Sequence, residues 1–397
     1  MKLSNRHIKV LKSVFAFEKP TTKEIASAVD LKPLVVTSLL ADLEAARIVD
    51  RTDRVISGRG RPALVYGFRA GYGSAIGIVL AQDVLRAVLI DFSKKSIMSR
   101  QTPIALPLEK KKSAEAAVSA IREEIRQMLT LEERAGPIRC IGLAIPGMVD
   151  TDKGTWVFGH QIAGVEDLPF RDLLQKEFGV PVVIEDSVRA LTLFHRIMGL
   201  GSSHRNFVLL RLAWGVGSGI VIGGELYRGT GGLAGEIGHL VVDKNGRHCT
   251  CGSVGCLETI VSEPRIIEHF RERLEQGVVS ALEISDKEKG VSLDDILAAL
   301  RKNDKFAATT IFKIGTYVGE ACSTLVKLFN PELLIVSGPV ARLGDFLREP
   351  IEMRMKQDVM RFALENLKVM IDVYSADNEA IGAALLASQH YLERQSS

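Results

Sequence analysis

Long apolar runs are missing from this sequence: none reaches about 18 residues, the length that a membrane-spanning helix needs. The first residues, MKLSNRHIKVLKSVF, have no apolar core followed by a small-residue cleavage site, so they do not resemble a signal peptide. Cysteine is scarce, with five in 397 residues, and three of the five are clustered. This usage favours a reducing cytoplasm and a metal site over a disulfide framework. We therefore expect a cytoplasmic protein with no membrane partner.

A strong net charge is also missing, since 51 Lys and Arg stand against 48 Asp and Glu. The charge is unevenly distributed, however. Residues 1–70 contain thirteen Lys or Arg and seven Asp or Glu, whereas the remainder is slightly acidic. The length allows two or three domains. A small basic module on a larger acidic body indicates nucleic acid as a partner of the N-terminal part.

Residues 1–70 have the spacing of a winged helix-turn-helix domain, in which the third helix reads DNA. We predict helices over Asn5–Phe17, from Thr21 and over Pro33–Ala46, and two wing strands over Ile48–Arg51 and Arg54–Ile56. Polar and basic side chains on the third helix and the wing are the candidates for contacts with operator DNA: Lys32, Thr37, Ser38, Arg54, Arg59 and Arg61.

Two features of this module leave alternatives open. The third helix begins with the apolar segment Leu34–Val36, which suits either thymine methyl groups or a protein partner. The segment Ser57–Pro62, SGRGRP, combines glycines that allow close approach to DNA with two arginines that reach phosphates or a minor groove. Its alternative interpretation is a flexible basic linker.

Residues 71–397 alternate strand patterns with helix patterns. Ser74–Leu80 and Leu85–Asp91 are predicted as paired strands, Ser113–Thr130 as a helix and Gly219–Ile222 as a later strand. Asp377–Leu392 closes the chain as a helix. This alternation predicts an α/β body whose sheets are covered on both faces, in two lobes with a ligand cleft between them.

The segment Gly231–Glu258 has the spacing of a metal site. Its three cysteines follow the pattern Cys249-x-Cys251-x4-Cys256, and His239 lies ten residues upstream of the first. Three thiolates and one imidazole supply the four tetrahedral ligands that a structural Zn²⁺ takes. The carboxylates of Glu236 and Glu258 lie on either side of these ligands in the sequence.

The same residues resemble the ROK family, which joins bacterial sugar kinases to sugar-responsive repressors with an N-terminal winged helix. The similarity covers nearly the whole chain. It rests mainly on the EIGH motif at Glu236–His239 and on Cys249–Glu258, and further on Ala144–Asp150, Gly223–Gly229 and Ala380–Ala384. The resemblance implies a sugar-kinase-like, actin-like ATPase fold. It also implies that Glu236, His239 and Glu258 bind a sugar, with His239 shared with zinc. Paired carboxylates suit this role because they only accept hydrogen bonds, whereas hydroxyls donate them.

The elements that serve ATP in the family's kinases are altered here. The family's first phosphate loop, D-x-G-G-T-K, corresponds to Val79–Val84, which has no glycine pair and no lysine. The position of the catalytic base is occupied by Ser187, with Asp186 before it; both stay candidates for contact with the sugar. The second phosphate loop corresponds to Ala213–Gly219, in which Trp214 would crowd a phosphate, and the adenosine-side glycine pair reads Ser337-Gly338.

We therefore predict a winged helix-turn-helix domain (1–70), a first lobe (71–195, completed by 377–397) and a second lobe with the zinc and sugar motif (196–376). The expected function is a sugar-responsive transcriptional repressor and not an enzyme. Its partners would be operator DNA, a monosaccharide or sugar-derivative effector, and further copies in a homodimer or homotetramer. The alternatives are an ATP-dependent sugar kinase with an appended DNA-binding domain, and a protein-interaction module that uses Leu34–Val36.

Overall fold

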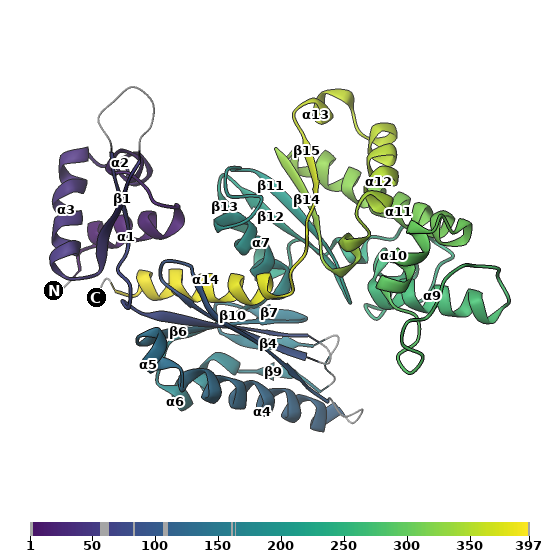
Figure 1. The fold of residues 1–397 in the computed structure, drawn as a ribbon, viewed down its shortest axis with the longest axis horizontal. Coiled ribbons are helices and arrows are strands. Elements are labelled where there is room, and N and C mark those ends of the chain that lie inside the picture. Colours follow the sequence, from purple (N-terminus) through teal and green to yellow (C-terminus); the bar gives the residue numbers. More distant parts are fainter. Residues whose placement is uncertain are drawn as a thin grey trace. The chain divides into compact units, whose positions relative to one another are not determined.

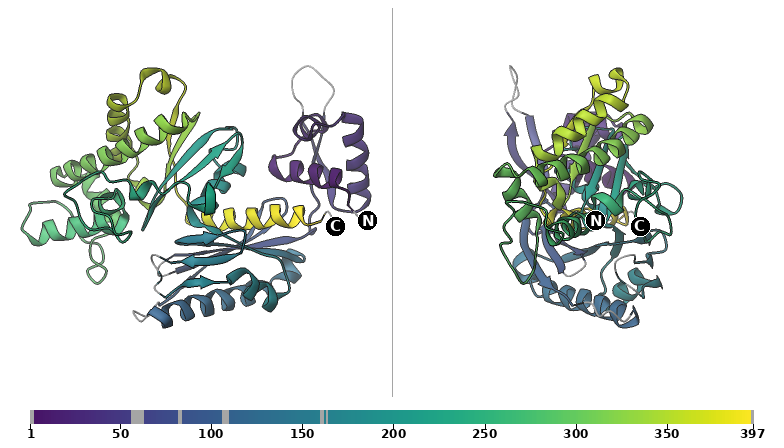
Figure 2. Two further views of the ribbon diagram at one scale, coloured as in Figure 1. Left: turned by 180° about the vertical axis from the view of Figure 1, so that it is seen from behind. Right: turned by 90° about the vertical axis from the view of Figure 1, so that its right-hand side faces the viewer.

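The computed structural model describes residues 3–395 apart from 56–62, 82–83, 106–109, 160–161 and 163. The chain forms two compact units, each with its own core (Figures 1 and 2). The first unit comprises Met1–Ile197 and Asp377–Ser397, and the second comprises Met198–Ala376. Among the described helices, none combines the length and the apolar character that crossing a membrane requires.

A winged helix-turn-helix opens the first unit, in agreement with the sequence prediction. It consists of α1 (Asn5–Ala16), α2 (Thr22–Val29), α3 (Pro33–Ala45), β1 (Val49–Val55) and β2 (Ala63–Phe68). Local chemistry sets the helix starts. The side chains of Ser4 and Thr21 accept backbone amides in capping boxes, and Pro33 occupies the first turn of α3. The inward faces of the helices form one apolar core, which includes Leu11, Phe15, Ile25, Val36, Leu40 and Leu43.

The wing differs from the sequence prediction. Ile48–Arg51 and Arg54–Ile56 do not pair with each other: Arg51 and Arg54 both lie in β1, with a register irregularity between them. The partner of β1 is β2, which runs antiparallel to it. Thr52 and Asp53 include neither glycine nor proline to reverse the chain. The connection between the two strands therefore contains the whole of 56–62, which lies outside the described residues.

A five-stranded sheet forms the centre of the rest of the first unit, in the order β10-β6-β3-β4-β5. Strands β10, β6 and β3 are parallel, and β3, β4 and β5 are antiparallel. Their bounds are β3 (Ser74–Leu80), β4 (Val84–Asp91), β5 (Ser96–Pro103), β6 (Ile138–Ile145) and β10 (Val182–Asp186). Three short strands make a separate sheet: β7 (Met148–Asp150), β8 (Thr155–Phe158) and β9 (Glu166–Leu168).

Helices cover both faces of the five-stranded sheet. On one face lie α7 (Ser187–Ile197) and α14 (Asp377–Glu393), and on the other α4 (Lys110–Leu129) and α6 (Phe170–Phe178), with the short α5 (Glu132–Ala135) nearby (Figure 2). The helix α14 comes from the far end of the chain and lies directly on β3 and β6. A Cβ at Gly77 or Gly142 would lie 1.9 Å from a carbonyl oxygen of α14, so the missing side chains allow this close packing.

The winged helix-turn-helix packs on the same face as α14. An aromatic cluster joins Phe15 and Phe68 of the winged helix to Tyr72, Phe92 and Tyr391, with ring centroids 5.2–6.2 Å apart. Such edge-to-face and tilted arrangements are favourable for aromatic rings. In addition, the Lys94 ammonium donates to the carbonyl oxygens of Phe15 and Phe17. The winged helix-turn-helix and the first sheet thus share a continuous core.

The second unit contains another five-stranded sheet, in the order β13-β12-β11-β14-β15. Its strands are β11 (Phe207–Leu212), β12 (Val216–Ile222), β13 (Glu225–Tyr227), β14 (Leu333–Ser337) and β15 (Lys368–Ile371). One large apolar core joins the sheet to the unit's helices. These are α8 (Glu258–Val261), α9 (Glu263–Glu275), α10 (Leu293–Arg301), α11 (Lys305–Phe329), α12 (Asp345–Asp358) and α13 (Arg361–Glu365), with 3-10 turns η1 (Thr230–Gly232), η2 (Ile237–His239) and η3 (Pro339–Leu343).

Candidate metal centre and ligand site

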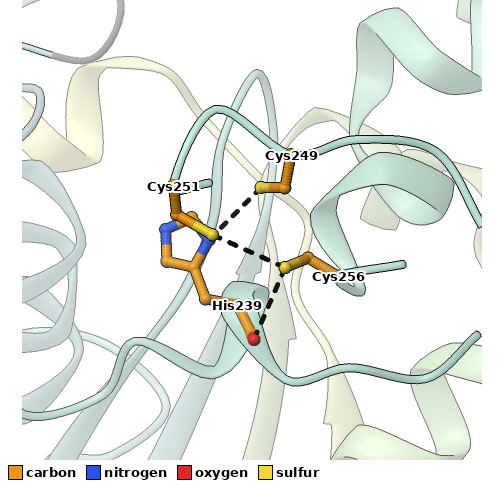
Figure 3. A group of neighbouring side chains, drawn as sticks. All are labelled: His239, Cys249, Cys251 and Cys256. Atoms are coloured by element: carbon orange, nitrogen blue, oxygen red, sulfur yellow. Dashed lines mark hydrogen bonds between the residues drawn. The ribbon is translucent and has the colours of Figure 1, made fainter. Parts of the chain in front are cut away.

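The four residues predicted as metal ligands converge in the second unit, between η2 and α8 (Figure 3). His239 ends η2, and the cysteines follow on a loop that folds back on itself. Gly255 accepts amide hydrogen bonds from Val242 and Asp243 and donates its own amide to Arg247. A Cβ at Gly255 would lie 1.5 Å from the Asp243 oxygen. Only glycine allows this fold of the loop, which places Cys249 and Cys256 within reach of His239.

The donor atoms have the spacing of a tetrahedral zinc site. All four lie within 4.8 Å of one another. The Sγ atoms of Cys251 and Cys256 are 3.6 Å apart, as are Sγ of Cys249 and Nδ1 of His239. With Zn–S bonds of about 2.3 Å, the edge of a tetrahedron between two sulfurs is about 3.8 Å. The residues present therefore fit one Zn²⁺ with three thiolates and one imidazole.

The thiols of Cys251 and Cys256 have pKa values shifted in opposite directions. Burial raises the pKa of the Cys256 thiol to about 12, whereas a hydrogen bond from the Ser253 backbone lowers the pKa of the exposed Cys251. A metal ligand has to be a thiolate, and a nearby cation stabilises that form. A bound cation would thus offset the cost of ionising the buried Cys256.

Glu236 lies beside this centre, directly before η2. Its Oε2 is 3.9 Å from Nε2 of His239, the ring nitrogen opposite the one that faces Cys249. The Glu236 side chain is 54% exposed. A carboxylate that accepts the hydrogen of the second nitrogen of a metal-binding histidine orients that imidazole, but 3.9 Å is longer than such a hydrogen bond. The predicted sugar ligand Glu236 therefore lies beside the imidazole of the predicted metal ligand His239.

Glu258 is held by a hydrogen bond from the backbone. It is the first residue of α8, and its Oε2 accepts a hydrogen bond of 3.0 Å from the backbone amide of Val216, at the start of β12. Gly238 also packs against this point, since a Cβ there would lie 2.1 Å from the Val216 oxygen. The structure thus joins the metal loop, Glu258 and the turn between β11 and β12 into one region of the second unit. Sequence spacing does not reveal the contact between Glu258 and Val216.

The remaining predicted sugar ligands, Asp186 and Ser187, belong to the first unit. Asp186 ends β10, and its Oδ1 accepts the amides of Val188 and Arg189, so it caps α7. Ser187 is buried as the first residue of α7. The sequence did not reveal the buried ion pair next to them, in which Nε of Arg189 lies 2.6 Å from Oε1 of Glu185. The assembly of Asp186 and Ser187 with the carboxylates of the second unit stays a prediction.

In the segments that correspond to the nucleotide-binding loops of the family's kinases, backbone and side-chain groups form hydrogen bonds. β12 begins at Val216, three residues before the predicted Gly219, because the glycine-rich segment pairs with β11. The amide of Val216 is bound to Glu258. The hydroxyl of Ser337 donates to Asp372. In the first loop, Ala81 and Val84 are joined by a backbone hydrogen bond, and residues 82–83 lie outside the described part of the chain.

The predicted polar residues at the third helix are exposed: Lys32 directly precedes α3, and Thr37 and Ser38 lie within it. The apolar surface predicted over Leu34–Val36 is smaller than expected, because Val36 is fully buried in the core while Leu34 is 85% exposed. Arg59 and Arg61 lie outside the described residues, and only the backbone of Arg54 is described, in β1.

Comparison with known proteins defines the class of this fold, that of ROK sugar kinases and regulators. A structure of a ROK family transcriptional regulator, a homologue of the Escherichia coli Mlc protein, covers 98% of this chain and 99% of its own with a TM-score of 0.82 and 24% identity. The ROK family model matches residues 75–390. The chain therefore belongs to the ROK family.

Relatives of both kinds are found within the family. The xylose repressor of Caldicellulosiruptor bescii is 24% identical over 363 residues, which are 91% of this chain and 90% of the relative. The glucokinase of Halalkalibacterium halodurans is 32% identical over 251 residues, which are 63% of this chain and 76% of the relative. The repressor similarity thus extends over more of the chain than the kinase similarity.

Proposed function

We propose that this protein is a sugar-responsive transcriptional regulator, a repressor whose DNA binding changes when a sugar binds. The observation that carries the proposal is the combination on one chain of a winged helix-turn-helix with a cluster of three cysteines and His239, beside which lies the carboxylate of Glu236. The repressor relatives have the same extent, which supports this assignment.

In the proposed site, Zn²⁺ at His239, Cys249, Cys251 and Cys256 fixes the loop, and Glu236, His239 and Glu258 bind sugar hydroxyls. Prior placement of these acceptors reduces the ordering cost of binding. Asp186 and Ser187 are the further residues that we propose as sugar contacts, and the bound sugar would favour one conformation of the protein over another. A ligand shifts such an equilibrium only through its different affinity for the two states.

In the proposed DNA complex, α3 enters the major groove with Lys32, Thr37 and Ser38, and Arg54, Arg59 and Arg61 of the wing contact the backbone or a minor groove. A homodimer or homotetramer in the cytoplasm would place two winged helices on a pseudo-palindromic operator.

We further propose that the protein is not a kinase. Ser187 has no basicity near neutral pH, and the amide of Val216 in the second loop is bound by Glu258. The kinase alternative is favoured by the similarity to the Halalkalibacterium halodurans glucokinase and by the carboxylate of Asp186 one residue before Ser187.

A thermal-shift screen of hexoses, pentoses and N-acetylated hexosamines, with and without ATP, tests the proposal. Binding of a sugar must raise the melting temperature in proportion to the logarithm of its concentration above Kd. A shift with sugar alone and no ATP-dependent product supports the regulator. Phosphorylated sugar at ordinary enzyme rates supports the kinase, and the absence of any sugar-dependent shift contradicts both.

A further inference from the structure

Trp214 lies on the turn between β11 and β12, and 42% of its surface is exposed. Its neighbours Ala213 and Val216 are buried, at 3% and 5%. Burial of a large apolar ring stabilises a protein, so a ligand that covers the exposed part of the indole would gain apolar burial. The exposed ring is available to a ligand.

The turn that carries Trp214 is fixed to the segment that carries Glu258. The carbonyl oxygen of Ala213 accepts a hydrogen bond of 2.9 Å from the amide of Glu263, and the amide of Val216 donates to Glu258. A further bond from the Ala213 amide to the Gly215 oxygen closes the turn. The backbone on both sides of Trp214 is therefore held by hydrogen bonds, one of which ends on Glu258.

The same turn is unsuited to a phosphate. A phosphate-binding loop needs unoccupied backbone amides and no negative charge nearby. Here the Val216 amide already donates to Glu258, and the carboxylate would repel an anion at that point. The occupant that fits is neutral, with an apolar face for the indole and hydroxyls for the carboxylates.

We propose that Trp214 forms an aromatic subsite next to the sugar site, and that the ligand is a glycoside whose second ring or aromatic substituent stacks on the indole. This inference rests on the proposed function. A pyranose ring has hydroxyls at its rim and an apolar face of C–H groups, so acidic acceptors and an aromatic ring bind different parts of it. Along the turn, Gly215 lies between Trp214 and Val216, and the amide of Val216 binds Glu258. The indole therefore contacts the part of the ligand beyond the ring that the carboxylates hold.

Binding constants of paired ligands test this subsite. Each monosaccharide that stabilises the protein is compared with its disaccharide and its phenyl glycoside, for the wild-type protein, Trp214→Phe and Trp214→Ala. We expect the wild type to bind the glycoside at least about tenfold more tightly than the monosaccharide, which corresponds to about 1.4 kcal/mol. Trp214→Ala should abolish this preference without changing monosaccharide affinity, and Trp214→Phe should retain part of it.

Fluorescence gives an independent measurement, because the sequence contains two tryptophans and the other one, Trp156, is fully buried. Quenching by acrylamide in the wild type should come from Trp214 and be absent in Trp214→Phe. The glycoside should protect this tryptophan from the quencher, while the monosaccharide should not.

Different failures have different meanings. If monosaccharides bind as tightly as glycosides, if the glycoside leaves quenching unchanged, or if Trp214→Ala weakens both ligands equally, the subsite is refuted and the sugar-responsive regulator stands. If no sugar or glycoside binds the wild type, the proposed function and the subsite are both refuted. Unchanged zinc content in the variants controls for loss of folding.

Discussion

The carboxylate of Glu258 accepts a hydrogen bond from the backbone amide of Val216, 3.0 Å away, and so connects α8 to the first residue of β12. This bond gives a predicted sugar ligand a second, structural role. It also occupies an amide in the segment that corresponds to a phosphate loop in the family's kinases. Two substitutions of Glu258, one that keeps an acceptor for the Val216 amide and one that removes it, can therefore show separately how Glu258 contributes to sugar binding and to stability.

Glu258→Gln keeps an oxygen that can accept the Val216 amide but removes the charge, whereas Glu258→Ala removes both. We expect Glu258→Gln to melt close to the wild type and to lose most of its sugar-induced stabilisation. Glu258→Ala should lose sugar binding and, in addition, about 1–3 kcal/mol of stability, because a buried amide loses a charged acceptor. Calorimetric melting with and without sugar measures both effects. Full sugar binding by both variants would contradict the assignment of Glu258.

The metal assignment predicts about one zinc ion per chain. Cys251→Ser should reduce the bound zinc to a small fraction and lower the melting temperature of the second unit by several degrees. Cys322→Ala is the matched control, because Cys322 is buried in α11 away from the cluster. Elemental analysis of the purified variants measures the zinc. Equal zinc content in Cys251→Ser and the wild type would show that the ligand set is wrong.

Thiol reactivity should follow burial. Burial raises the pKa of Cys140 and of Cys322 to about 12, so at pH 8 only about one in ten thousand of each is a reactive thiolate. Cys251 is exposed. After chelation of the metal, we expect iodoacetamide to modify Cys251 first and to leave Cys140 and Cys322 unmodified until the protein unfolds. Mass spectrometry of timed samples measures the order, and early modification of Cys322 would contradict the packed core.

Replacing both Arg59 and Arg61 by alanine should weaken binding to all DNA sequences by at least about tenfold. It should also reduce the slope of log K against log salt by about 2, since each phosphate contact contributes about 0.9. Arg271→Ala is a control for charge alone, because Arg271 is an exposed arginine of α9 in the second unit. Titrations at several salt concentrations measure the slope. If the double variant keeps the wild-type slope, the wing does not contact phosphates.

Local chemistry made much of the fold predictable. Thr21 and Pro33 mark the helix starts that the structure shows, and the cysteine spacing predicts the cluster with His239. The predicted pairing within the wing is wrong because the polar pair Thr52-Asp53 resembles a turn but lies within β1. The exposed polar strand β5 lacks the alternation that identifies a strand, and α12 contains Pro350, which argues against a helix. The bond between Glu258 and Val216 joins residues 42 positions apart, so it depends on tertiary packing.

The most direct test of the central claim measures DNA affinity as a function of sugar. A DNA fragment selected by the protein from a random pool is titrated by fluorescence anisotropy, with and without the sugar that most stabilises the protein against heat. We expect saturating sugar to change the DNA affinity of the wild type at least about fivefold, within the usual range of allosteric coupling, and to leave that of Glu258→Gln unchanged. Equal DNA affinity of the wild type with and without a sugar that demonstrably binds would contradict a sugar-responsive regulator.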